Sequence, residues 1–391
     1  MDTYDGPIGK HLQHFVNREV EACCLSSPRK TMPRMAAGMP SATDWTTTQN
    51  LQDPMRQVWV DHARGIGIIL VVLGHVLGGL YKPGLFPNET LLRWIIYTLY
   101  TFHMPMFFFL AGLNARHSLR RGASSFLAGK VTTIAYPYVL WSLIQGSVIM
   151  LMAREANNPL TAGDLAGIWY RPIGQFWFLY ALMICHVVAC IVTRQAVMVS
   201  LAISGFVIFS WLHDPPDLAL TLHHFAFYVV GRYAPDAVIR SQVRPLAGWL
   251  AWIGLVIAFA IAAAIDGSRF GLHPNGITAL PASVLGIAAV ILLSKLLDPR
   301  WYRWLAAIGT TSMSIYILHI LAGSGMRIAM LKLHVPPWPW VYVIAGTVAG
   351  VLLPMLAHVT LRRLGLLTAL GLAPSPIIRV QPAPSLAAAQ R

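Results

Sequence analysis

Two ionisable side chains, Arg64 and His75, lie in one apolar stretch of the chain at a spacing that places them on one helix face. The stretch covers residues 59–80 and reads WVDHARGIGIILVVLGHVLGGL. The two side chains are eleven residues apart, which is almost three turns of an α-helix at about 3.6 residues per turn. At about 1.5 Å per residue, His75 lies roughly 16 Å further along the axis, near the middle of a hydrocarbon layer about 30 Å thick. An ionisable residue at that depth indicates a functional site, and the alternative is a histidine hydrogen-bonded between helices.

A second histidine, His103, is expected at a similar depth in the next apolar stretch, LYTFHMPMFFFLAG at residues 99–112. It lies about ten residues after Arg93, or roughly 15 Å at helical rise. Pro105 removes the helical partner of the Thr101 carbonyl and is expected to kink the helix beside His103, although a kink used only for packing is the alternative. Two imidazoles at one depth suit proton transfer from a hydroxyl, because imidazole can act first as a base and then as an acid.

Basic side chains gather at the end of these stretches that is expected to face the cytoplasm. Guanidinium groups make paired hydrogen bonds to phosphate oxygens, so such a cluster suits recognition of a phosphate-bearing donor. The alternative is the ordinary excess of basic residues in cytoplasmic loops, and the two interpretations are compatible. The predicted donor-binding set is Arg64, Arg116, Arg120, Arg121 and Lys130.

The composition is that of a membrane protein. The 391 residues are 56% hydrophobic and only 11% charged, with a mean hydropathy of +0.59, whereas about a quarter of the residues of a soluble protein are charged. The net charge of +14 does not indicate nucleic-acid binding, because the basic residues are spread among short loops between apolar runs. The four cysteines form adjacent or within-helix pairs without zinc-ligand neighbours, so they are expected to be reduced and structural.

We therefore predict an all-α polytopic membrane protein with about ten transmembrane helices. The expected spans are 62–81, 92–115, 133–153, 175–193, 196–212, 218–234, 246–265, 277–297, 308–330 and 339–361. A polar cytoplasmic tail over 1–57 precedes a ten-helix domain over 58–361, and a Pro- and Ala-rich cytoplasmic tail over 362–391 follows it. Most of the 29 lysines and arginines fall in segments that are cytoplasmic when both termini lie inside.

The acidic residues argue against an ion-coupled transporter. None of the 15 aspartates and glutamates lies well inside a predicted span, whereas proton- or sodium-coupled transporters commonly need a carboxylate at membrane depth. No HExxH, GxSxG or Gly-rich phosphate motif is present either, and no metal site is expected.

Several motifs together resemble the integral-membrane acyltransferase-3 family, whose members O-acylate extracytoplasmic and cell-surface glycans. The resemblance extends from about Val58 to Leu361 and is greatest to the fucose 4-O-acetylase-like members, including the rhizobial nodulation-factor acetylases. The first two motifs are specific in combination and weak alone. The motifs are Arg64 and His75 with ten residues between them, FHMPMFFFLAG at 102–112, the basic loop running into Tyr136-Pro137-Tyr138, FWFLYAL at 176–182 and GTTSMSIYILH at 309–319.

The resemblance implies a ten-span core, an acyl-CoA donor on the cytoplasmic side and a glycan hydroxyl as acceptor. It makes His75 and Arg64 the essential pair and places His103 in the motif of the subgroup. Some members have two arginines separated by two residues in a cytoplasmic loop, whereas this chain has Arg116, Arg120 and Arg121. Others carry a hydrolase-like C-terminal domain. This chain ends soon after the tenth span, so it is expected to complete transfer within the membrane unit or to hand the acyl group to another protein.

The predicted function is that of an O-acetyltransferase in a bacterial inner membrane. It would move an acetyl group from acetyl-CoA, a substrate rather than a resident cofactor, to a glycan hydroxyl, for example on a fucosyl residue of a lipo-chitooligosaccharide or on a surface polysaccharide. His75 would take the hydroxyl proton, and His103 would orient the acceptor or stabilise developing charge; a route through an acyl-histidine is left open. A carrier for a glycan or lipid-linked sugar, and a sensor or structural subunit, are the alternatives.

Three further residues are candidates for acceptor binding. Trp177 and Tyr180 could stack on a sugar, with packing as the alternative, and His319 could contact the acceptor or hydrogen-bond between helices. His223 and His224 lie near the expected outer end of the sixth span, where a surface position is favoured over acceptor contact.

Overall fold

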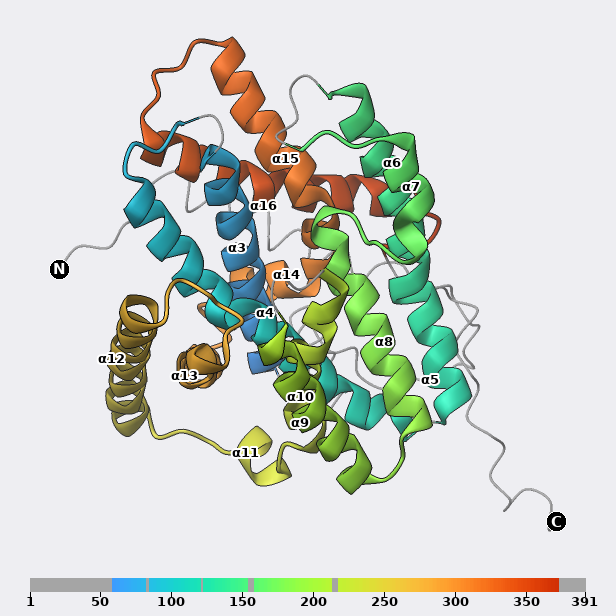
Figure 1. Ribbon diagram of the computed structural model, residues 1–391, viewed down its shortest axis with the longest axis vertical. Helices are drawn as coiled ribbons and strands as arrows, with labels where there is room; N and C mark the ends of the chain where they lie inside the picture. The colour runs from blue at the N-terminus through green and yellow to red at the C-terminus, as the bar shows by residue number, and fades with distance from the viewer. Residues whose placement is uncertain (1–57, 82–83, 121, 154–157, 213–216, 373–391) are drawn as a thin grey trace, which may run out of the picture.

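The computed structural model describes residues 58–81, 84–120, 122–153, 158–212 and 217–372, and every regular element within them is helical (Figure 1). The all-α prediction is confirmed. The helices are α3 Val58–Tyr81, α4 Glu89–Leu119, α5 Ala123–Lys130, α6 Tyr136–Leu151, α7 Ala162–Ala166, α8 Trp177–Ile191, α9 Gln195–Trp211, α10 Leu220–Tyr233, α11 Asp236–Arg240, α12 Pro245–Arg269, α13 Leu280–Leu296, α14 Arg303–Thr310, α15 Ser312–Lys332 and α16 Pro339–Arg363. A π-helical turn over Val131–Ala135 joins α5 to α6, and short 3-10 turns cover Gly167–Trp169, Gly174–Phe176, Asp217–Ala219 and Ile277–Ala279.

Within the described residues, eight helical segments are long and apolar enough to cross a membrane, rather than the ten that the sequence suggested. The other two expected spans are helices, but they are shorter. α9 has 17 residues and α10 has 14, which at about 1.5 Å per residue gives roughly 26 Å and 21 Å. Both fall short of a hydrocarbon layer of about 30 Å.

Helix α12 shows how the outer surface of the bundle suits lipid. Only 11% of its most apolar window is buried, and large aliphatic side chains remain exposed along its length. An apolar face of this size on a soluble protein would aggregate, whereas hydrocarbon chains cover it in a membrane. The exposed side chains include Leu246, Leu250, Ile253, Ile257, Ile261 and Ile265.

Helix α3, which carries Arg64 and His75, packs against α4, α13, α14, α15 and α16 (Figure 1). Its contact with α14 depends on two glycines. A Cβ atom on Gly309 of α14 would overlap the Asp61 carbonyl of α3, and one on Gly65 of α3 would overlap the Leu305 carbonyl of α14. Small residues let helix backbones approach closely in membranes, so these glycines fix the N-terminal half of α3.

The C-terminal half of α3 is held by α15 and α16 through Val76, the residue after His75. A Cβ atom on Gly323 of α15 would lie 3.3 Å from a Val76 methyl, and one on Gly346 of α16 would lie 2.9 Å from the other. Because Val76 fills the space left by both glycines, the rotation of α3 about its axis is fixed beside His75.

Helix α4 crosses α10 at a second pair of glycines. Gly112 of α4 lies against the Tyr228 carbonyl, and Gly231 of α10 lies against the Phe109 carbonyl, so a Cβ atom on either would overlap backbone. The crossing buries the C-terminal half of α4 and most of α10 in the main apolar core.

Helix α4 continues through Pro105, and the carbonyl that this proline leaves without its helical partner is satisfied from another helix. The Ser283 hydroxyl of α13 donates to the Thr101 carbonyl at 2.7 Å. Proline has no N–H to complete the i to i−4 bond, and a buried carbonyl without a donor is costly. Ser283 therefore fixes α13 beside the segment of α4 that carries His103.

The chain after α16 packs onto the N-terminal end of α6. Leu367 and Leu372 are buried, the Tyr136 hydroxyl donates to the Ala369 carbonyl at 2.5 Å, and the Trp141 indole donates to the Leu370 carbonyl at 2.8 Å. The first part of the segment predicted as a tail over 362–391 is thus packed as far as residue 372, while the rest of it and the tail over 1–57 lie outside the described residues.

Candidate functional site

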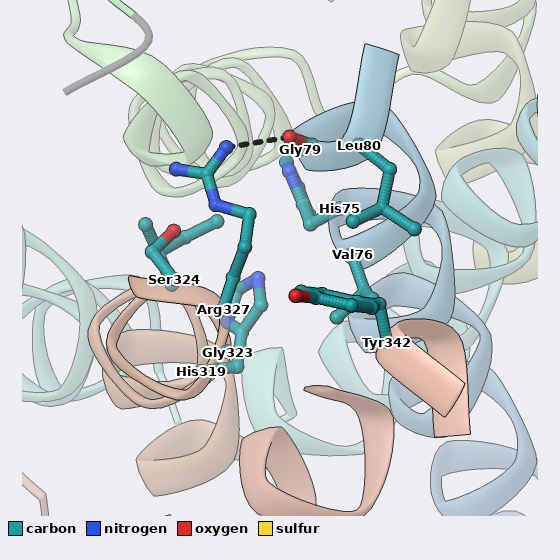
Figure 2. Close-up of a pocket in the computed structure, with 10 residues that line it drawn as sticks. His75, Val76, Gly79, Leu80, His319, Gly323, Ser324, Arg327 and Tyr342 are labelled. Carbon is teal, nitrogen blue, oxygen red and sulfur yellow. Dashed lines mark hydrogen bonds between the residues drawn. The ribbon is translucent and has the colours of Figure 1, made fainter. Parts of the chain in front are cut away.

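Two imidazoles from different parts of the chain face one pocket. His75 of α3 and His319 of α15 have ring centroids 5.0 Å apart. Both line a pocket among α3, α15 and α16 (Figure 2), whose volume of about 20 Å³ has room for about one water molecule. The remaining lining residues are Val76, Gly79, Leu80, Ile320, Gly323, Ser324, Arg327 and Tyr342. His75 therefore faces a pocket that is lined by residues of α3, α15 and α16.

The orientation of His319 is fixed by its own helix. Its Nδ1 lies 2.6 Å from the Tyr316 carbonyl and 3.1 Å from the Ile315 carbonyl. A carbonyl oxygen only accepts, so Nδ1 carries the proton and the lone pair belongs to Nε2. Within the described residues, that Nε2 is buried without a hydrogen-bond partner. An acceptor nitrogen in this setting is suited to receive a hydroxyl proton or a hydroxyl hydrogen bond.

His103 lies behind the pocket and reaches His75 through an aromatic ring. Its ring centroid is 4.7 Å from that of Tyr100, and the Tyr100 centroid is 6.3 Å from that of His75. His103 is 1% exposed, and its Nδ1 lies 2.6 Å from the Leu99 carbonyl, so it too is protonated at Nδ1. The structure thus brings the two predicted catalytic histidines into one row, with Tyr100 between them, and His103 is not among the residues that line the pocket.

The described members of the predicted donor-binding set have different partners. Arg64 lies in the second turn of α3, with its Nη1 3.6 Å from an Asp61 carboxylate oxygen. Arg116, near the end of α4, donates to the Ala234 carbonyl at 2.7 Å and pairs with Asp236 at 3.0 Å. These two contacts join α4 to the connection between α10 and α11, which is a structural role.

Of the other members, Arg120 and Lys130 lie at the ends of α4 and α5, respectively. Arg120 is exposed and follows the last turn of α4, and the Lys130 ammonium lies 5.2 Å from the centre of the Phe126 ring. Arg121 lies outside the described residues.

Trp177 and Tyr180, the predicted sugar-stacking residues, are packed elsewhere. Trp177 stacks on Phe108 with centroids 6.3 Å apart. The Tyr180 hydroxyl donates to the Trp169 carbonyl at 2.8 Å, and its ring lies against Tyr138. Neither residue lines the pocket that holds His75 and His319, although Trp177 contacts His224, with ring centroids 5.2 Å apart.

The expected surface position of His223 and His224 is wrong, since each is only 1% exposed. The short α10 packs between α4 and α9, and this covers the histidine face: His223 stacks on Phe206, and His224 lies against Phe108. A surface position was inferred from closeness to a chain turn, whereas the burial comes from helices distant in sequence.

Arg327 is a pocket residue that the sequence did not single out. It is 8% exposed, and its Nη1 donates to the Gly79 carbonyl of α3 at 2.6 Å (Figure 2). The sequence does contain a pattern that places Arg327 beside His319. His319, Gly323 and Arg327 are spaced by four residues and therefore share one face of α15.

The described residues contain no group of three or more His, Cys, Asp or Glu side chains that could hold a metal ion. The polar side chains around the pocket are imidazole, guanidinium, hydroxyl and phenol, a set suited to proton transfer and to binding oxygen-rich molecules.

The apolar helices and a match to a known family together define a membrane-embedded acyltransferase. The acyltransferase domain family Acyl_transf_3 matches residues 57–359, and the chain belongs to this family.

Two curated relatives are nodulation proteins. The chain is 27% identical over 143 residues to the nodulation protein NolL of Mesorhizobium japonicum, which covers 35% of this chain and 36% of that protein. It is 30% identical over 131 residues to NolL of Sinorhizobium fredii, which covers 33% of this chain and 34% of the relative. The matches thus span about a third of the length of these relatives. No solved structure matches the chain.

Proposed function

We propose that this protein transfers an acetyl group from acetyl-CoA on the cytoplasmic side to a hydroxyl of a glycan on the opposite side of the membrane. Membership of an acyltransferase family supports the reaction type. Similarity to two nodulation proteins supports a saccharide acceptor, with a fucosyl residue of a lipo-chitooligosaccharide or a surface polysaccharide as candidates.

The observation that carries the proposal is the pair of imidazoles in one pocket, His75 and His319. An acetyl transfer to a hydroxyl needs a base that can take the hydroxyl proton as the oxygen attacks the thioester carbonyl. The unpartnered Nε2 of His319 and the adjacent His75 ring supply two groups of this kind.

In the proposed reaction, His75 takes the proton from the sugar hydroxyl while the hydroxyl oxygen forms a bond to the thioester carbonyl carbon. The C–S bond then breaks, and the CoA thiolate takes the proton from the His75 imidazolium. His319 accepts at Nε2 a hydrogen bond from a second hydroxyl of the acceptor sugar, which orients the ring. His103 holds Tyr100 against His75, which keeps the His75 ring oriented toward the pocket.

A two-step route, in which His75 is first acetylated and then gives the acetyl group to the acceptor, uses the same residues. Enclosure among helices serves both routes, because it keeps water away from the thioester and limits its hydrolysis.

Donor binding is assigned to the cytoplasmic ends of the first helices. Arg64, Arg120, Arg121 and Lys130 are the candidates for the CoA phosphates, since guanidinium and ammonium groups bind phosphate oxygens. Arg116 would have to exchange Asp236 for a phosphate, which makes it the weakest member of the set. The inner-membrane location with both termini inside is part of the proposal, and the distribution of basic residues supports this orientation.

Labelled acetyl-CoA tests the proposal. Membranes that contain the protein should incorporate acetyl label into glycan extracted from a deletion strain, and membranes without it should not. Transport of the glycan without incorporation of label would support the rival carrier function. Mass spectrometry of the labelled product would identify the acceptor sugar and the acyl group.

A further inference from the structure

The pocket that holds His75 also contains a buried arginine, and this combination bears on the charge of the acceptor. Arg327 is the one lysine or arginine among the ten lining residues, and none of the ten is an aspartate or glutamate. The pocket lining is therefore positively charged and favours a negatively charged group. Burial strengthens this preference, because charge interactions weaken less with distance where water is excluded.

The guanidinium of Arg327 is held at a defined place relative to the histidines. Its Nη1 donates to the Gly79 carbonyl, and Gly79 lies four residues after His75 on α3, or about 6 Å further along the helix axis. Figure 2 shows the side chain extending along the pocket wall toward that carbonyl. A saccharide whose hydroxyl meets His75 would thus place a substituent on the same or the neighbouring ring close to Arg327.

The guanidinium of Arg327 is suited to bind an oxyanion. Guanidinium is planar and offers five N–H donors, which suits the paired oxygens of carboxylate and phosphate. The Nη1 bond to the Gly79 carbonyl holds the guanidinium beside the end of α3. Ser324 and Tyr342 add polar side chains to the same wall.

We propose that Arg327 binds a carboxylate or phosphate of the acceptor, so that the acetylated glycan is an anionic saccharide. This rests on the proposed function and specifies its acceptor. Arg327 is then an acceptor-binding residue, and its loss should weaken acceptor binding more than it slows the chemical step.

The first test uses the wild-type protein only. Full-length protein in lipid nanodiscs is incubated with labelled acetyl-CoA and envelope glycan from a deletion strain, and the labelled product is separated on an anion-exchange resin. The label should bind the resin. Reduction of carboxyl groups in the glycan before the reaction should lower incorporation at least about tenfold if the group is a uronate, and phosphatase treatment should do so if it is a phosphate. A labelled product that is neutral would overturn the proposal.

The second test uses variants of Arg327. Arg327→Gln should raise the apparent KM for the glycan at least about tenfold with a smaller change in kcat, and Arg327→Lys should lie between this variant and the wild type. Arg269→Gln is the matched control, since Arg269 is an exposed arginine at the end of α12. Unchanged glycan KM in Arg327→Gln would contradict the proposal.

The two proposals fail in distinguishable ways. If wild-type protein labels no glycan at all, the acetyltransferase function is wrong and the acceptor assignment falls with it. If it labels neutral glycan as readily as acidic glycan, the acetyltransferase function stands and Arg327 only joins α15 to the end of α3.

Discussion

His75 and His319 belong to helices that are far apart in the chain, and a functional role for either ring is inferred from its closeness to the other. Alone, either could be a histidine hydrogen-bonded between helices. Their ring centroids lie 5.0 Å apart beside a pocket, and this closeness is the reason that we propose a shared chemical role, since an imidazole is costlier to desolvate than an apolar ring.

At the residue scale, we predict that His75→Ala lowers glycan acetylation by about 10²- to 10⁴-fold, the range typical of a lost general base. Incorporation of acetyl label per amount of folded protein measures this. His273→Ala, an exposed loop histidine between α12 and α13, is the control and should keep wild-type activity. Normal acetylation by His75→Ala would remove this residue from the mechanism.

His319 gives a prediction that separates a chemical role from a structural one. If Nε2 accepts a hydrogen bond from a neighbouring hydroxyl of the acceptor sugar, His319→Ala should lower kcat/KM for the glycan by about tenfold or more even in protein that remains folded. Steady-state kinetics normalised to the folded fraction from size-exclusion chromatography would measure it. Reduced thermal stability with unchanged kcat/KM would show instead that the ring only links helices.

At the scale of helices, close backbone contact rather than large apolar side chains positions the site. Gly309 lets α14 pack closely on the N-terminal half of α3. Val76, beside His75, packs against Gly323 and Gly346. In a membrane, lipid is as apolar as leucine, so helices associate through close packing at small residues and through hydrogen bonds. The Ser283 bond to the Thr101 carbonyl is an example of the second kind.

The importance of close packing at glycines can be tested where α4 crosses α10. Gly112→Ala places a methyl group against the Tyr228 carbonyl, and we expect it to destabilise the protein by about 1–3 kcal/mol, as overpacking usually does. Gly254→Ala is the matched control, because a Cβ atom there meets nothing within 4 Å. Thermal unfolding of both variants in one detergent should show a lower midpoint for Gly112→Ala only, and equal midpoints would refute the packing argument.

At the scale of the whole molecule, the predicted orientation puts the two substrates on opposite sides. The pocket extends from His75 to Arg327 and Tyr342, near the ends of α3 and α15 and the start of α16 that are predicted to face outward. Arg64 and the junction of α4 and α5 lie at the ends predicted to face the cytoplasm. Donor and acceptor would then meet near mid-membrane.

Orientation can be measured with single cysteines in a background without the native ones. We expect His273→Cys, between α12 and α13, to react with a membrane-impermeant maleimide in intact spheroplasts, and Asp298→Cys, between α13 and α14, to react only after lysis. Both positions are exposed. The opposite labelling pattern would invert the orientation and place the pocket on the cytoplasmic side.

The sequence by itself predicted the all-helical fold and the placement of His75 and His103 within the first two apolar helices, because hydrophobic run length and helical spacing are local properties. It also indicated that the Thr101 carbonyl would need a new partner, but it could not name Ser283. Only the tertiary structure showed that His319 lies beside His75 and that Arg327 lines the same pocket. It also showed that His223 and His224 are buried, and that Trp177 and Tyr180 do not line the pocket of His75. Each of these depends on which helix faces meet, and that choice is made by close contacts between glycines and backbones far apart in the chain.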